Sequence, residues 1–212
     1  MVTDRFIQIC PSRTGSSTIK KIINAMAADG RIEMIDRVAH TSYKTNVIRY
    51  TQYCHAKGYV VVIPPVVCSI RNPWAWYVSK WWFGLERSPD LGFASTFAGH
   101  LDDVRGGRGA ESWNFGTWTN AWNHVGGDHA DYVRRYEDYA DEAVRVWSLV
   151  MPDLVDKTEW YGRIEKLGKF ECGLGNTGKQ HRPYQEYYTP ETRRWVAEWD
   201  AAQIERWGYS FD

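Results

Sequence analysis

The opening of the chain places an apolar segment, a polar loop and an amphipathic helix directly after one another. Residues 5–10 (RFIQIC) are typical of a short strand, and residues 11–17 (PSRTGSS) of a loop. Residues 18–29 have helical spacing of apolar side chains, and Gly30 ends the pattern. The apolar face of this helix is formed by Ile19, Ile22, Ile23 and Met26. Strand, loop and helix in this order are the opening unit of an α/β fold.

The rest of the chain alternates in the same way. Branched apolar runs predict strands at 31–38, 60–63 and 66–70, and the last two have the uninterrupted apolar pattern of buried parallel strands. Helical spacing predicts helices over 43–57, 73–82, 118–124, 139–151 and 189–207. We therefore predict an α/β fold with a mainly parallel sheet flanked by helices.

Chain length favours one domain. The 212 residues compare with roughly 150 for an average domain. Residues 84–131 contain nine of the 18 glycines and few periodic apolar positions. We therefore predict a single domain over 1–212, with a glycine-rich insertion or lid at about 84–131.

Composition excludes several classes of protein. Lys+Arg and Asp+Glu are both 26, which disfavours a nucleic-acid or membrane-surface partner, since either would favour a basic excess. The four cysteines form no CxxC pair, and no two histidines have the i, i+4 spacing of a helical zinc motif. We find neither a signal-peptide pattern nor an apolar segment long enough to span a bilayer, so we expect a cytoplasmic protein.

The loop between the first strand and helix has the features of an anion site. Gly15 allows close approach of the backbone to a ligand, and amides at a helix N-terminus attract negative charge. Arg13 adds a fixed positive charge. Hydrogen bonds can also come from Thr14, Ser16, Ser17 and Thr18. No lysine follows Gly15, so the Walker A pattern is absent, and an ordinary helix N-terminus remains the alternative.

A second candidate segment begins where strand 66–70 ends. Arg71 follows that strand directly, at the edge where open α/β sheets bind ligands. Ser79 comes eight residues later, two turns into the next helix. An arginine with a hydroxyl can hold a second phosphate, although Arg71 could equally be a structural ion-pair partner.

Together the two segments resemble the sulfotransferase family, which uses 3′-phosphoadenosine 5′-phosphosulfate (PAPS). That family has a P-x-x-G-[ST]-[ST] loop and, after a later strand, an R-[DN]-P segment with a serine eight residues beyond the arginine. The corresponding residues here are Pro11, Gly15, Ser16, Ser17, Arg71, Asn72, Pro73 and Ser79, with three residues between Pro11 and Gly15 where the family pattern has two. Residues 131–138 resemble the family's R-[YF]-E-[DN] segment, and residues 176–211 resemble the C-terminal part of bacterial and glycan-modifying members.

The resemblance implies roles for these residues. The loop would hold the 5′-phosphosulfate, and Arg71 with Ser79 would hold the 3′-phosphate. Arg13 stands where cytosolic members usually have lysine, so it can stabilise charge but cannot give up a proton. The cytosolic R-K-G-x-x-G loop is missing, and Lys179 and Arg182 could replace it at the 3′-phosphate. The resemblance implies no metal requirement.

Sulfuryl transfer needs a base that reaches the acceptor hydroxyl. His40 is the leading candidate because it follows strand 31–38 and precedes a helix, which places it at the ligand edge of the sheet. A helix cap or a surface histidine is the alternative role, and Glu33 and Asp36 are fallback bases. The weaker histidine candidates are His55, His100, His124 and His129.

These observations predict a sulfotransferase that moves the sulfuryl group from PAPS to a hydroxyl and releases 3′-phosphoadenosine 5′-phosphate (PAP). The acceptor would be a small molecule or a glycan; a carbohydrate agrees with the glycan-modifying resemblance and with the 12 tryptophans. Two alternatives stay open, an ATP-dependent phosphotransferase and a non-catalytic glycan-binding protein. The sequence leaves the oligomeric state undefined.

Overall fold

A computed structural model describes residues 1–87, 90, 92–107, 116–154, 156, 159–162 and 182–212. The chain divides into two compact units, which we describe separately. The first contains residues 1–70 and 122–171, and the second contains residues 71–121 and 172–212. Within the described ranges, no helix is both long and apolar enough to cross a membrane.

The first unit is built on a five-stranded sheet of order β3-β1-β2-β4-β5. Its strands are β1 (Val2–Thr3), β2 (Ile7–Ile9), β3 (Met34–Asp36), β4 (Val66–Ile70) and β5 (Tyr132–Arg135). β2, β4 and β5 are parallel, whereas β1 is antiparallel to both of its neighbours. β3 therefore points the same way as β2. The predicted mainly parallel sheet is confirmed, with β1 as the reversed strand.

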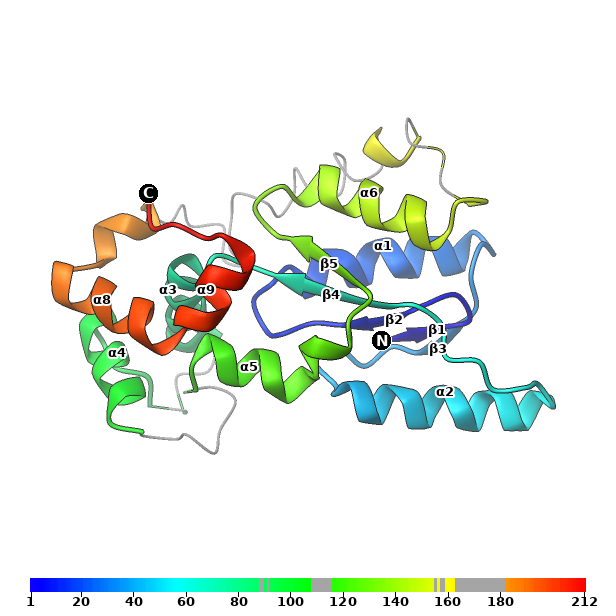
Figure 1. Cartoon of the computed structure of the whole chain (residues 1–212), viewed down its shortest axis with the longest axis horizontal. Helices are drawn as coiled ribbons and strands as arrows, with labels where there is room; N and C mark the ends of the chain where they lie inside the picture. Colours follow the sequence, from blue (N-terminus) through cyan, green and yellow to red (C-terminus); the bar gives the residue numbers. More distant parts are fainter. Residues whose placement is uncertain (88–89, 91, 108–115, 155, 157–158, 163–181) are drawn as a thin grey trace. The chain divides into compact units, whose positions relative to one another are not determined.

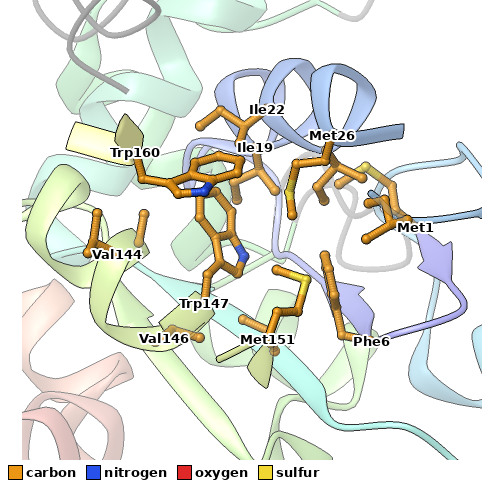
Figure 2. Close-up of a cluster of buried hydrophobic side chains, with 14 of the residues drawn as sticks. Met1, Phe6, Ile19, Ile22, Met26, Val144, Val146, Trp147, Met151 and Trp160 are labelled. Atoms are coloured by element: carbon orange, nitrogen blue, oxygen red, sulfur yellow. The ribbon is translucent and has the colours of Figure 1, made fainter. Parts of the chain in front are cut away.

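Helices cover both faces of this sheet. Figure 1 shows α1 (Ser16–Ala28) and α6 (Tyr139–Val150) on one side and α2 (Tyr43–Lys57) on the other. The core lies between the sheet and the helices α1 and α6, where Ile19, Trp147 and Trp160 are almost fully buried (Figure 2). The predicted helices at 18–29, 43–57 and 139–151 are confirmed to within two residues.

One predicted strand of this unit is wrong. Residues 60–63 form no strand, and Val60 and Val62 are 87% and 70% exposed. Pro64 and Pro65 lack the N–H groups that a ladder needs. The parallel pairing with β2 accordingly begins only at Val66.

The second unit is helical. It contains α3 (Pro73–Arg87), α4 (Phe97–Arg105), the 3₁₀ turn η3 (Tyr184–Tyr187), α8 (Pro190–Trp199) and α9 (Ala201–Trp207). The predicted single helix over 189–207 is wrong, because the chain breaks at Asp200. α4 lies in the region predicted as glycine-rich and poorly periodic. α5 (Trp118–Val125) begins in this unit and confirms the helix predicted at 118–124.

Aromatic side chains form the core of the second unit. Trp74 and Trp81 are 4% and 6% exposed, and their ring nitrogens donate to backbone carbonyls of Arg193 and Ala94. Trp81 also packs edge-on against Phe97 at 5.6 Å between ring centroids. These tryptophans therefore serve packing, and they do not offer a sugar-binding face.

Candidate anion-binding and catalytic site

The loop after β2 ends in a left-handed glycine that begins α1. Gly15 is the N-cap of α1 with φ 83°, and Thr14 Oγ1 closes the loop by donating to Pro11 O at 2.7 Å. A Cβ on Gly15 would lie 2.9 Å from Cδ2 of Tyr136 and 3.2 Å from Cε2 of Tyr139. Both the backbone conformation and the close packing therefore require glycine here.

The N-cap residue of α1 supplies no side-chain cap. Among the described helices, α2, α4 and α8 are capped by the side chains of Ser42, Thr96 and Thr189. The N-cap of α1 is a glycine, and its first turn contains no acidic residue; the N-cap residues of α6 and α9 make no side-chain cap either. Amides at such an end favour an anion, which agrees with the anion site predicted for residues 11–18.

The loop side chains that we assign to this site all lie in the first unit. Arg13 is half-buried, Ser16 is 9% exposed, and Ser17 is exposed. Thr14 and Thr18 are buried, so their hydroxyls are less open to a ligand. The site therefore offers backbone amides with Arg13, Ser16 and Ser17 as its most accessible groups.

Two residues in this region have unusual backbone conformations. Arg13 and His40, with φ 65° and 63°, are the non-glycine residues with positive φ in the part of the chain that the structure describes. A left-handed residue with a Cβ costs about 1–2 kcal/mol. Such strained residues cluster at functional sites, and these two are the residues that the sequence nominates for catalysis.

Both ring nitrogens of His40 take part in hydrogen bonds, one as donor and one as acceptor. Nδ1 lies 3.1 Å from the carbonyl oxygen of Cys10, and Nε2 lies 3.2 Å from Oγ of Ser16. Because a carbonyl oxygen can only accept, Nδ1 carries the proton, and the lone pair of Nε2 accepts from the Ser16 hydroxyl. The ring is thus oriented with its basic nitrogen at the first residue of α1.

The surroundings of His40 also favour its neutral form. Desolvation lowers the pKa of His40 below its ordinary value, and the positive charges of the N-terminus, Arg13 and Lys20 add to this effect. The hydrogen bond to Cys10 opposes them but does not reverse the direction. The residue as a whole is exposed, whereas both of its ring nitrogens are engaged in partly buried hydrogen bonds.

The fallback bases Glu33 and Asp36 are engaged elsewhere. Glu33 accepts a hydrogen bond from the Tyr53 hydroxyl at 2.7 Å, which is the main cause of its lowered pKa. Asp36 forms an ion pair with Arg49. Among the three candidates, His40 is therefore the one that contacts the loop.

The second group of predicted residues belongs to the second unit. Half-buried Arg71 directly follows β4, and Ser79 is 9% exposed within α3. Asn72 lies at the start of α3, where its Oδ1 accepts from the Ala75 amide at 3.3 Å. Arg182 is exposed and lies 3.8 Å from Glu186. Lys179 lies outside the described residues.

Sequence reasoning missed several partners of the site. The Ser16–His40 hydrogen bond joins residues 24 positions apart, and neither residue type signals that contact. His129 stacks on Tyr43, three residues after His40, with ring centroids 4.2 Å apart.

Within the described ranges, no group of three or more His, Cys, Asp or Glu side chains could hold a metal ion.

Comparison with known proteins identifies the fold. No protein-family model and no curated protein sequence matches the chain. Among solved structures, it is similar to mouse sulfotransferase SULT7A1 in complex with PAP, with a TM-score of 0.61 over 95% of this chain and 84% of that chain. The fold is that of a sulfotransferase. Sequence identity is only 14%, so this likeness establishes the α/β P-loop-like architecture alone.

Proposed function

We propose that this chain is a PAPS-dependent sulfotransferase that sulfates a hydroxyl group and releases PAP. The observation that carries the proposal is the pairing of a helix N-terminus that begins with glycine and an oriented, neutral His40 beside it. An anion site and a base are the two components that sulfuryl transfer requires. The presence of PAP in the structurally similar mouse enzyme supports the same choice of nucleotide.

The residues divide into two cofactor-binding groups. The 5′-phosphosulfate would be held by the α1 amides, by the hydroxyls of the loop and by the guanidinium of Arg13. The 3′-phosphate would be held by Arg71 and Ser79, with Lys179 and Arg182 as additional cations. PAPS, when bound, supplies the sulfuryl group and a phosphate leaving group.

His40 would act as the general base. Its Nε2 lone pair would take the proton of the acceptor hydroxyl once the Ser16 hydroxyl turns from Nε2 to donate to the bound anion. The hydrogen bond from Nδ1 to Cys10 O keeps the ring oriented and helps it carry the resulting charge. Arg13 would stabilise the negative charge that develops on the leaving oxygen. Because arginine stays protonated, Arg13 cannot serve as a proton donor.

The acceptor class is a separate proposal. We infer a carbohydrate hydroxyl from the resemblance of the C-terminal segment to glycan-modifying sulfotransferases. The tryptophan content does not strengthen this inference, since Trp74 and Trp81 are buried in the core of the second unit.

The titration of His40 gives a direct test of the base. In the unliganded protein we expect a pKa below the ordinary 6.5, because desolvation and the charges of Arg13, Lys20 and the N-terminus disfavour the imidazolium. Neutral His40 is the active form, so activity should fall as pH drops through this lowered value. Proton NMR titration measures the pKa, with His40→Asn assigning the signal. A value at or above 6.5 would contradict this electrostatic picture.

Nucleotide binding tests the function itself. Calorimetry with PAP, AMP and Mg-ATP should show PAP binding most tightly. Arg71→Ala should weaken PAP binding by about 1.5–3 kcal/mol for each charge-assisted hydrogen bond removed. Arg194→Ala is the matched control, because Arg194 is an exposed arginine of the same unit paired with Glu198. Preference for Mg-ATP would support a phosphotransferase, and PAP affinity unchanged by Arg71→Ala would remove Arg71 from the site.

A further inference from the structure

Three buried polar side chains lie in a row across the strands that lead to the loop. Ser69 pairs with Arg134 in the parallel β4–β5 ladder, and Cys10 directly follows the end of β2. Cys10 Sγ lies 3.9 Å from Ser69 Oγ, and all three residues are at most 2% exposed. The row lies at the carboxyl ends of β2, β4 and β5, just before the anion-binding loop begins.

Arg134 is the charged member of this row. Its Nη2 donates to Ser69 Oγ at 2.8 Å, and its guanidinium lies over the rings of Tyr139 and Trp147 at 4.7 and 5.5 Å. Nε and Nη1 are buried, and neither has a hydrogen-bond partner within the described ranges. No described carboxylate forms an ion pair with Arg134.

These contacts do not balance the cost of burying the charge. Burying an ion without a counter-charge is strongly unfavourable, and cation–π contacts offset only part of that cost. The Cys10 thiol is not the missing counter-charge. Burial raises its pKa, and the opposing effect of Arg134 is smaller. Arg134 is therefore a buried positive charge without a counter-charge among the described residues of the first unit.

Tyr139 links Arg134 to the loop. The same ring that covers the guanidinium packs against Gly15, where a Cβ would lie 3.2 Å from its Cε2. Tyr139 therefore contacts both the guanidinium of Arg134 and the residue that begins α1. Because Arg134 and Tyr139 are buried, the charge of Arg134 would be only weakly screened from an anion bound at that helix end.

We propose that Arg134 is a buried counter-charge for the 5′-phosphosulfate, acting beneath the loop without contacting the ligand. This inference rests on the proposed function. Arg134 is then a positioning residue: it strengthens binding of a highly charged group at the 5′ position and leaves the 3′ position unaffected. It also makes the unliganded protein less stable than an apolar residue would.

The test compares Arg134→Met with wild type by calorimetry and thermal unfolding. For the methionine variant, affinity for PAP and for AMP should fall about tenfold. Both nucleotides carry a 5′-phosphate, and the variant loses one attractive charge interaction with that group. Affinity for adenosine 3′-monophosphate should change less than twofold. Arg134→Lys, which keeps the charge, should bind PAP more tightly than the methionine variant does. Arg145→Met removes an exposed arginine and is the control.

Unliganded Arg134→Met should melt at the wild-type temperature or above, because replacing an uncompensated buried charge by an apolar side chain is often stabilising. A lower melting temperature would overturn the proposal, as would unchanged PAP affinity or equal losses for all three nucleotides. If the variant does not fold, Arg134→Gln gives the same comparison while keeping a donor for Ser69. Failure of wild type to bind PAP would overturn the proposed function as well.

Discussion

Replacing His40 by alanine should lower kcat by about 10²- to 10⁴-fold, the usual contribution of a general base. Affinity for PAP should change by less than about twofold. His40 contacts the loop through Ser16 and is not one of the groups that bind phosphate in the proposed site. The measurement is PAPS-dependent sulfation of an acceptor found by screening, with PAP binding followed separately by calorimetry. Wild-type turnover in this variant would end the role of His40 as base.

Two companion variants separate the base from the backbone. His40 has φ 63°, so alanine could shift the local chain as well as remove the imidazole. Asparagine tolerates this conformation better, and His40→Asn should lose turnover to the same extent if the lost group is the base. His55→Ala removes an exposed histidine at the end of α2 and should keep full activity. Retained activity in His40→Asn would assign His40 a structural role.

Local patterns predicted the elements that hold the site. The strand, loop and helix at residues 5–29 follow from strand propensity, a glycine and helical spacing, and all three are local signals. The prediction at 60–63 is wrong because Pro64 and Pro65, which follow directly, lack the N–H groups that a strand ladder needs. α4 is not predicted from the sequence, although Thr96 is a typical helix cap and Phe97, Leu101 and Val104 have helical spacing. The many glycines around this short helix favour the prediction of a loop.

The site was less predictable than the fold. Sequence ranks His40 above Glu33 because of its place after strand 31–38, yet the hydrogen bonds that engage the two residues join positions far apart in the chain. Glu33 is engaged by Tyr53, 20 residues away, and His40 by Ser16. Burial of Arg134 was likewise invisible, since an arginine in a strand is usually solvated. Such contacts follow from strand order, which no local pattern encodes.

Replacing Asp200 should lower the free energy of unfolding more than replacing any other residue of the second unit. This carboxylate is fully buried at the break between α8 and α9. It accepts hydrogen bonds from the amide and hydroxyl of Thr119 at 2.8 and 2.7 Å, and from the hydroxyl of Tyr77 at 3.0 Å. It thereby supplies a negative acceptor to the first turn of α5. Asp200 is the residue at which the predicted helix over 189–207 is interrupted.

Asp200→Ala should lower the free energy of unfolding by about 3–5 kcal/mol, because the donors of Thr119 and Tyr77 lose their acceptor in a buried site. Urea unfolding measures the change. Asp212→Ala is the control; its carboxylate is exposed, lies 4.0 Å from Arg193, and should contribute less than about 1 kcal/mol. A loss below about 1 kcal/mol for Asp200→Ala would show that water can satisfy these donors.

Asp200→Asn then separates charge from hydrogen bonding. The amide keeps one acceptor oxygen, but its NH₂ group would face a donor, either that of Tyr77 or those of Thr119. Asparagine should therefore lose less stability than alanine and more than the Asp212 control.

Burial also lowers the pKa of Lys80 to about 7, and the charge of Asp200 opposes that shift. With the charge removed, the pKa of Lys80 should fall further, so an unchanged Lys80 titration in Asp200→Asn would show that the two groups do not interact.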